Sequence, residues 1–236
     1  MHGIISSIQT AKGFQELSSQ CYRHFAKSGV CQFCYFHFPP VGAVDYDRVK
    51  IIVWLGYPNA LVEAYREAGF IEDNPLILRL LAEKRPVWTK TVLGAHGATP
   101  NERAYLNLLN TCGVKDDLVI PVFGPGGRNG GYGIGFEDGA TPVTAAKISE
   151  IQWVCQSAHL KYCELLDKKL DKPPELSARE ADVLRLIARG RTNKQIAEKL
   201  EVASKTIETY LARTFAKLEV NDRMTAALRA ISIGII

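Results

Sequence analysis

The sequence predicts an α+β protein with two domains, and three observations predict it. Segments rich in β-branched and aromatic residues are separated by turn residues, which is typical of antiparallel strands. The segments around them, and everything after residue 175, show the apolar spacing of helices. A charged run that ends in Pro173-Pro174 lies between the two parts and has the composition of a domain linker.

The first part is expected to form an α-β-α sandwich around an antiparallel sheet, because helical segments flank the predicted strands. The predicted strands are 30–38, 49–55, 118–123 and 131–136. The predicted helical segments are 4–25, 59–68, 75–83, 103–111 and 143–170. The glycine-rich stretch 124–130 is interpreted as a hairpin connection rather than a phosphate loop, because no Lys-Ser/Thr pair and no helix follow it.

The second part is expected to be entirely helical. Ser177 with Glu180, and Thr192 with Gln195, match the capping box that starts a helix. Ser204 is expected to cap a third helix that runs to about Leu218. The short turn 201–203 joins the second and third helices, which is the spacing of a helix-turn-helix.

The outer side of that third helix indicates a nucleic-acid interface. Small, hydrogen-bonding and basic residues on an exposed helix face can enter the major groove of DNA. We expect Thr209 and Arg213 to read base edges, and Lys205 and Thr206 at the helix start to meet phosphate. The full set of predicted DNA-binding residues is Lys194, Lys205, Thr206, Thr209, Arg213 and Lys217. A small helical bundle used for protein contacts stays open as the alternative.

Composition sets weaker limits. The net charge of +4 includes +3 from residue 175 onward, where 11 Lys+Arg face 8 Asp+Glu, a mild indication of a polyanionic partner. No signal-peptide pattern and no apolar run of about 20 residues occurs, so a cytoplasmic protein without membrane contact is expected. Cys31 and Cys34 form a C-x-x-C within a strand-like run and are interpreted as small buried residues rather than a metal or redox site. The histidines are scattered, so we expect no catalysis, metal or cofactor.

Several motifs occur together near the C-terminus. They are Leu176-Ser-Ala-Arg-Glu180, Gly190, Thr192-Asn-Lys-Gln-Ile-Ala197, Lys205-Thr-Ile207 and Lys217-Leu-Glu-Val220. Residues 176–236 thereby resemble the output domain of LuxR-type transcription regulators, which implies binding to duplex DNA. Tyr210 and Arg213 replace the family's usual His and Asn, so the operator sequence cannot be taken from relatives. The helix from Met224 onward looks like the family's dimerisation surface; closure of the small core is the alternative, and the two roles are compatible.

A second, weaker pattern lies in the first part. Its residues are Tyr57-Pro58, Leu61, Tyr65, Asn74-Pro75, Pro86-Val-Trp88, Cys112-Gly113-Val114 and Ile120-Pro121-Val122. The pattern resembles the autoinducer-binding domain that senses acyl-homoserine lactones. Leu61 stands where the family has a Trp that donates to the lactone carbonyl, and Asn74 where it has an Asp that accepts from the ligand amide. Asp117 stands where relatives usually carry Gly.

These departures predict a different signal. A lost neutral hydrogen bond whose partner stays unpaired costs about 1–3 kcal/mol. A charge-assisted bond reduced to a neutral one costs about 1 kcal/mol more, so lactone binding is expected to weaken by roughly one to three decades. We expect a less polar, aromatic or otherwise non-lactone signal. The predicted ligand-binding residues are Tyr35, Trp54, Tyr57, Leu61, Tyr65, Asn74 and Trp88, although each ring could equally be ordinary core.

The resemblances predict a sensor and dimerisation domain over residues 1–170, a linker over 171–175 and a helix-turn-helix DNA-binding domain over 176–236. The predicted function is that of a quorum-sensing regulator of the LuxR type, controlled by a small apolar signal. It would bind a palindromic operator in double-stranded DNA as a homodimer, with RNA polymerase an open further partner. The alternative is a ligand-independent regulator whose first domain serves dimerisation only. An enzyme with an accessory DNA domain is disfavoured.

Overall fold

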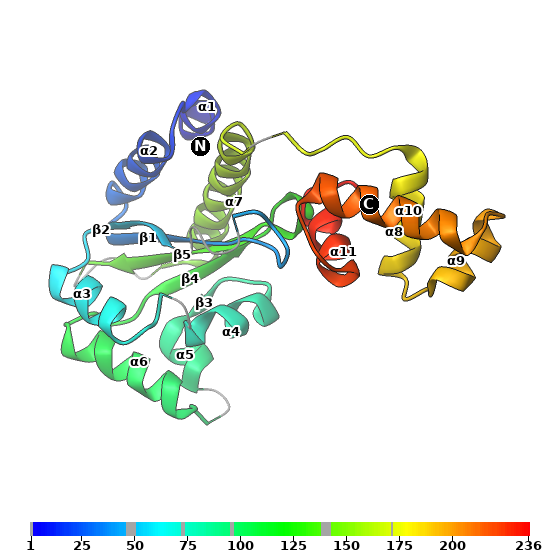
Figure 1. Cartoon of the computed structure of the whole chain (residues 1–236). Helices are drawn as coiled ribbons and strands as arrows, with labels where there is room; N and C mark the ends of the chain where they lie inside the picture. The colour runs from blue at the N-terminus through cyan, green and yellow to red at the C-terminus, as the bar shows by residue number, and fades with distance from the viewer. Residues whose placement is uncertain (1, 46–50, 72–73, 95–96, 138–142, 171) are drawn as a thin grey trace. The chain divides into compact units, whose positions relative to one another are not determined.

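The chain forms two compact units in the computed structural model, which describes residues 2–45, 51–71, 74–94, 97–137, 143–170 and 172–236 (Figure 1). The first unit comprises Met1–Phe38, Val49–Pro125 and Asn129–Lys169. The second unit comprises Pro39–Arg48, Gly126–Arg128 and Leu170–Ile236. The predicted fold class is confirmed, since a five-stranded antiparallel sheet lies in the first unit and a set of helices in the second.

The sheet has the strand order β2-β1-β5-β4-β3, with every neighbouring pair antiparallel. Its strands are β1 (Val30–Phe38), β2 (Ile51–Leu55), β3 (Val87–Trp88), β4 (Leu118–Val122) and β5 (Asn129–Phe136). The pairing register places Trp54, Cys34, Gly133 and Val119 side by side across β2, β1, β5 and β4. This row lies on the face of the sheet that carries the candidate ligand site.

Helices cover both faces of the sheet (Figure 1). On one face lie α1 (His2–Thr10), α2 (Phe14–Ala26) and α7 (Ala145–Asp167). On the other lie α3 (Asn59–Glu67), α4 (Pro75–Glu83), α5 (Thr89–Gly94) and α6 (Pro100–Thr111). The predicted α-β-α sandwich is therefore confirmed.

Each face of the sheet has its own core. On the α7 side, the rings of Tyr35 and Tyr132 stack with centroids 4.6 Å apart, and the Tyr35 hydroxyl is 2.7 Å from Nδ1 of His159. On the other side, the Tyr65 ring meets those of Trp54 and Tyr105 edge to face, at 5.1 Å and 6.0 Å. Such aromatic pairs add to the stabilisation that burial provides.

The predicted elements differ from the observed ones in a few places. Residues 4–25 fall in two helices, because the chain is extended at Gly13. The two-residue strand β3 and the six-residue helix α5 were not predicted, since segments so short carry no visible periodicity. Helix α6 begins at Pro100 rather than Arg103, because Thr99 and Glu102 form a capping box. Residues 49 and 50 of the predicted second strand lie outside the described residues.

The second unit contains α8 (Ala178–Ala188), α9 (Asn193–Leu200), α10 (Ser204–Leu218) and α11 (Arg223–Ser232) around a single apolar core. Both predicted capping boxes are confirmed: the Glu180 amide donates to the Ser177 hydroxyl at 3.3 Å, and the Gln195 amide to the Thr192 hydroxyl at 3.3 Å. The prediction that Ser204 caps the third helix is wrong. Ser204 is the first helical residue, and the capping position falls on Ala203, whose methyl group cannot accept a hydrogen bond.

Candidate ligand cavity and nucleic-acid interface

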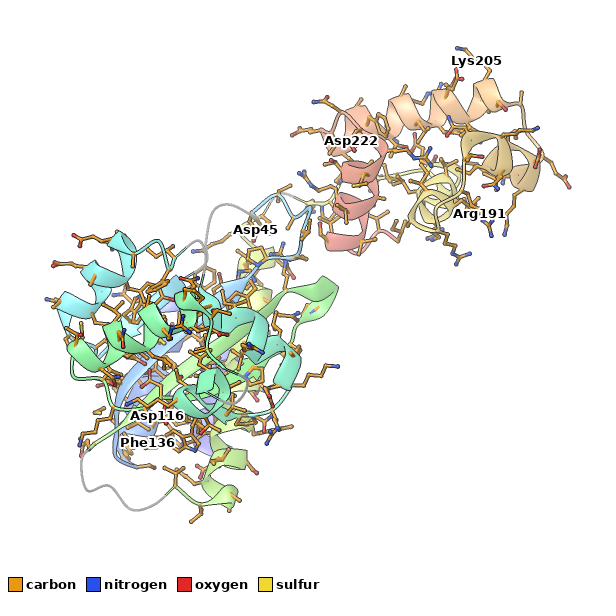
Figure 2. All side chains as sticks on the ribbon, turned by 90° about the horizontal axis from the view of Figure 1, so that it is seen from below. Asp45, Asp116, Phe136, Arg191, Lys205 and Asp222 are labelled. Atoms are coloured by element: carbon orange, nitrogen blue, oxygen red, sulfur yellow. The ribbon has the colours of Figure 1, made fainter. Side chains whose placement is uncertain are left out.

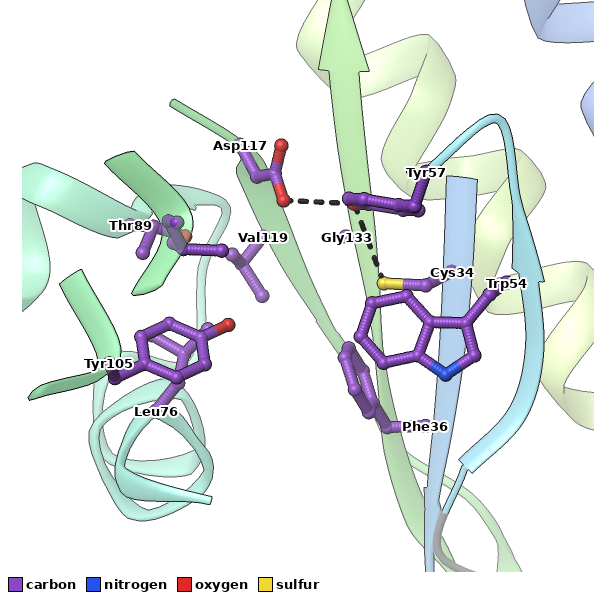
Figure 3. A pocket seen from close by; sticks show the side chains of 11 residues that line it. Cys34, Phe36, Trp54, Tyr57, Leu76, Thr89, Tyr105, Asp117, Val119 and Gly133 are labelled. Atoms are coloured by element: carbon purple, nitrogen blue, oxygen red, sulfur yellow. Dashed lines mark hydrogen bonds between the residues drawn. The ribbon is translucent and has the colours of Figure 1, made fainter. Parts of the chain in front are cut away.

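A small cavity lies between the sheet and the helices α4, α5 and α6 (Figure 3). Its volume is about 10 Å³, which is room for a group the size of one water molecule. The row of Trp54, Cys34, Gly133 and Val119 supplies its sheet side. The full lining is Cys34, Phe36, Trp54, Tyr57, Leu76, Thr89, Tyr105, Leu109, Asp117, Val119 and Gly133.

A hydrogen-bonded chain of three side chains crosses this lining (Figure 3). The Tyr57 hydroxyl donates to Oδ2 of Asp117 at 2.8 Å, and the Cys34 thiol donates to the same hydroxyl at 3.6 Å. Burial raises the pKa of Asp117 to about 6, with the bond from Tyr57 acting in the opposite direction and the charge of Asp116 adding to the rise. Burial also raises the pKa values of Tyr57 and Cys34, so both stay protonated at neutral pH. Asp117 is therefore the one lining group that can change charge near neutral pH.

The structure brings together only part of the predicted ligand-binding set. Trp54 and Tyr57 line the cavity. Leu61 and Tyr65 are buried in the adjoining core, and neither lines the cavity. Two further predicted residues lie elsewhere in the first unit: Tyr35 faces α7 on the opposite side of the sheet, and Trp88 packs beside Phe136 with ring centroids 6.1 Å apart. Neither of these two rings lines this cavity, and their role in ligand binding stays a prediction.

Asn74 does not line the cavity either, because its side chain serves the protein itself. Its Oδ1 accepts from the Leu76 amide at 2.8 Å and thereby caps helix α4. Its Nδ2 donates to the Tyr65 hydroxyl at 2.5 Å. Asn74 was expected to accept from a ligand amide, but its carbonyl oxygen is already engaged.

Sequence reasoning missed most of the lining. Unpredicted lining residues are Cys34, Phe36, Leu76, Thr89, Tyr105, Leu109, Asp117, Val119 and Gly133. A signal existed for one of them, because Asp117 was noticed as a departure from the family's usual glycine. Tyr105 could have been found through the Thr99–Glu102 capping box, which fixes the start and hence the faces of α6.

The exposed side of α10 is the candidate nucleic-acid interface. Its exposed residues recur at intervals of three and four, so they form one continuous stripe along the helix. They are Ser204, Lys205, Glu208, Thr209, Ala212, Arg213, Ala216 and Lys217. Lys205 extends outward from the start of the helix (Figure 2). Its ammonium lies 2.9 Å from the Glu208 carboxylate. The exposed pair is weak and can open for a phosphate.

The remaining predicted residues differ in how freely they reach solvent. Lys194 is exposed on α9, and Thr206 is half-buried at the start of α10. Lys217 is exposed but engaged within the domain: its ammonium donates to Glu180 Oε2 at 2.8 Å and to the Glu175 carbonyl at 3.1 Å. Burial would raise the pKa of Glu180, but the bonds from Lys217 and Ser177 outweigh it and lower that pKa. A phosphate would have to compete with both contacts for Lys217.

Helix α11 shows which residues close the core and which remain free. Ala226, Ala227 and Ala230 are buried in the core of the second unit. Met224 is 70% exposed and Ile231 is 46% exposed. Since these two residues lie seven apart, they fall on one side of the helix. The buried alanines fit a helix that closes the core, and the exposed Met224 and Ile231 fit a dimerisation surface, so each role predicted for this helix has its own residues.

Other kinds of site find little support in the described parts of the chain. No group of His, Cys, Asp or Glu there is arranged to hold a metal ion. The six cysteines are free thiols. None of the helices there combines the length and apolar character that crossing a membrane requires.

Comparison with known proteins assigns both units. The bacterial regulatory proteins of the luxR family match residues 174–230. The autoinducer binding domain matches residues 14–162, which is more than half of the chain.

Individual proteins similar to this chain are also transcription regulators or share its fold. The transcriptional activator protein SolR of Ralstonia nicotianae is 29% identical over 239 residues, covering 98% of this chain and 96% of SolR. The uncharacterized transcriptional regulatory protein YhcZ of Bacillus subtilis is 44% identical over 69 residues, which is 29% of this chain and about a third (32%) of YhcZ. The crystal structure of Escherichia coli SdiA superposes with a TM-score of 0.76 over 100% of this chain and 97% of SdiA, at 16% identity, which supports the fold alone. The chain belongs to the LuxR-type transcription regulators, non-enzymes that join an autoinducer-binding domain to a helix-turn-helix domain for DNA.

Proposed function

We propose that this regulator responds to a small apolar signal other than a standard acyl-homoserine lactone and binds a palindromic operator as a homodimer. The proposal of a non-lactone signal rests on the polar groups in and beside the cavity, which either are absent or already have partners within the protein. Leu61 offers no donor, the Asn74 side chain is used twice within the protein, and the Tyr57 hydroxyl is used by Asp117. A lactone head group would have to break these bonds before it gained its own.

A fold of this kind accommodates head groups other than lactones. SdiA, which is similar in fold to this chain with a TM-score of 0.75 and 16% identity, has been solved in complex with octanoyl-rac-glycerol. An acylglycerol carries hydroxyl groups and no lactone ring. This supports a non-lactone signal for the present chain.

The DNA contact is proposed to run along the exposed stripe of α10. Thr209 and Arg213 lie in the middle of the stripe, where a helix in the major groove approaches base edges. Lys205 and Thr206 lie at the start of the helix, where free backbone amides add to the attraction for phosphate. Lys194 adds a phosphate contact from α9. The main role proposed for Lys217 is structural, through its ion pair with Glu180.

The homodimer is supported by exposed apolar residues on two helices. Trp153 and Leu160, seven apart on α7, are 60% and 48% exposed. Met224 and Ile231 repeat this arrangement on α11. Large apolar side chains gathered on one helix face are typical of an association surface. A twofold dimer would present two α10 helices to half-sites about one DNA turn apart.

The signal is tested by ligand stabilisation of the full-length protein. A panel of acyl-homoserine lactones and octanoyl-rac-glycerol is added at about 10 µM, where a Kd below about 1 µM would raise stability by about 1.4 kcal/mol or more. We expect no such rise with any lactone. The matched variant Asn74→Asp, which restores the family's carboxylate, should respond better to lactones than the wild type. A sub-micromolar lactone response of the wild type would contradict the proposal, and failure of the dimer to retain any genomic DNA fragment would contradict its DNA half.

A ligand-independent regulator is the second candidate, and the size of the cavity favours it. Pockets for drug-sized ligands measure roughly 300–1,000 Å³, whereas this cavity measures about 10 Å³. Purified protein that dimerises and retains its operator without added ligand, with no further gain from cell extract, would support this candidate.

A further inference from the structure

The carboxylate of Asp117 is unusual for the wall of a ligand cavity. The residue is 6% exposed, and one oxygen, Oδ2, accepts from Tyr57. The other oxygen, Oδ1, has no hydrogen-bond partner among the described residues. None of the side chains that line the cavity there is cationic. An ionised carboxylate in such surroundings is costly unless a donor or a positive charge reaches it.

The neighbouring strand is shaped to leave room for this group. On β5, the side of Gly133 and Gly135 where a β carbon would stand faces Asp117. A β carbon at Gly133 would lie 2.6 Å from the Cys34 sulfur and 3.2 Å from the Tyr57 hydroxyl, and one at Gly135 would lie 3.1 Å from Asp117 Oδ1. Any larger residue at Gly133 would crowd the hydrogen-bonded side chains of Cys34 and Tyr57. One at Gly135 would crowd Gln32 and Asp117. The two glycines therefore leave the space that the Asp117 carboxylate occupies.

The rest of the lining suits a positive charge with an apolar body. Trp54, Tyr57 and Tyr105 present aromatic rings to the cavity (Figure 3). Ring faces attract ammonium groups, and more strongly when both are out of water. The volume of about 10 Å³ admits a group the size of an ammonium. A longer body would have to displace the half-buried Trp54, whose ring rests edge to face on Tyr57 at 5.1 Å.

We infer that the cavity binds a protonated amine attached to an apolar body, with the ammonium paired to Asp117. This inference rests on the proposal that the cavity is the signal site, and it adds a cationic head group to the apolar body of the proposed signal. It differs from a neutral acyl signal, which would leave the carboxylate without a counter-charge.

The test uses three probes of matching size: phenethylamine, 2-phenylethanol and phenylacetate. Each is titrated into the full-length protein near pH 7.5, and binding is followed by the thermal midpoint and by tryptophan fluorescence. We expect phenethylamine to bind about tenfold more tightly than the alcohol, because a hydrogen bond between charged groups exceeds a neutral one. Phenylacetate should bind least, because its charge repels that of Asp117.

Two variants decide whether Asp117 is responsible. In Asp117→Asn the preference for the amine should disappear. In Tyr57→Phe it should persist, because the carboxylate remains and loses only an internal donor. Equal binding of all three probes by the wild type, an amine preference that survives in Asp117→Asn, or no binding of any probe up to about 10 mM would each overturn the inference. These readouts need no DNA, so operator retention by the same proteins shows separately whether the proposed function stands.

Discussion

Replacement of Asp117 by asparagine should stabilise the first unit at neutral pH and leave it almost unchanged in acid. Burial raises the pKa of Asp117 from its ordinary 3.8 to about 6 in the folded protein. The folded state therefore holds this proton more tightly than the unfolded state, and stability falls as the pH rises from about 4 to about 6. At 1.36 kcal/mol for each pKa unit, the loss amounts to about 3 kcal/mol. Asparagine keeps an acceptor for Tyr57 and carries no charge, so it escapes this loss.

The chain offers a convenient probe for this measurement. It has three tryptophans, and all of them (Trp54, Trp88 and Trp153) lie in the first unit. Tryptophan fluorescence during urea denaturation of the full-length protein therefore reports the unfolding of that unit. Between about pH 4 and pH 7.5 the variant's advantage should grow from near zero to about 3 kcal/mol. In thermal unfolding near neutral pH this corresponds to a rise of roughly 6–12 °C in the midpoint.

Asp116→Asn is the matched control. Asp116 adjoins Asp117, is only half-buried, and accepts from the Lys90 amide at 3.0 Å. Its replacement should produce a smaller change of the same sign. An advantage of Asp117→Asn that is independent of pH, or that grows toward acid, would refute the reasoning.

Three further predictions concern the second unit. Arg213→Ala should cost about 1–3 kcal/mol in operator binding and relax base preference, whereas Lys205→Ala should weaken all sequences alike and reduce the salt slope by about 1; a gel-shift competition in which Arg213→Ala keeps full selectivity would count against its role. Lys217→Met should lower the free energy of unfolding by about 2 kcal/mol, because buried Glu180 loses its partner. Denaturation followed by circular dichroism measures this change, and an unchanged free energy of unfolding would contradict the prediction. Glu201→Gly should raise the free energy of unfolding by about 1 kcal/mol, because Glu201 adopts a left-handed conformation with φ of 55° that glycine adopts without strain. A lower free energy of unfolding for this variant in the same denaturation experiment would contradict the prediction.

The exposed stripe of α10 could be predicted from the sequence because it lies on a helix with clear boundaries. The capping boxes at Ser177 and Thr192 fix where α8 and α9 begin, and the 3.6-residue period then decides which side of α10 is free. What the period could not reveal is the contact of Lys217 with Glu180, which joins residues far apart in the sequence. An exposed lysine and a lysine held by a buried carboxylate look identical in a helical pattern.

The cavity was harder to predict because its strands are buried on both faces. In β1 the run from Phe33 to His37 is buried without alternation, so the sequence gives no reason to place Tyr35 on one face rather than the other. The structure turns Tyr35 toward α7 and Cys34 and Phe36 toward the cavity. Which face each residue occupies follows from pairing with β5, a contact between segments about a hundred residues apart along the chain that no local pattern encodes.

Under the proposed amine site, Asp117 connects the stability of the first unit with signal recognition. A buried carboxylate without a counter-charge lowers the stability of the folded domain at neutral pH, as the raised pKa expresses. A cationic ligand that pairs with it would return that free energy on binding, in addition to the stabilisation that any ligand of the folded form provides by mass action. An asparagine or glycine at this position would give a more stable domain whose folding depends less on the signal. The same side chain would thus make the regulator both selective for its ligand and dependent on it, and Asp117→Asn should weaken both properties together.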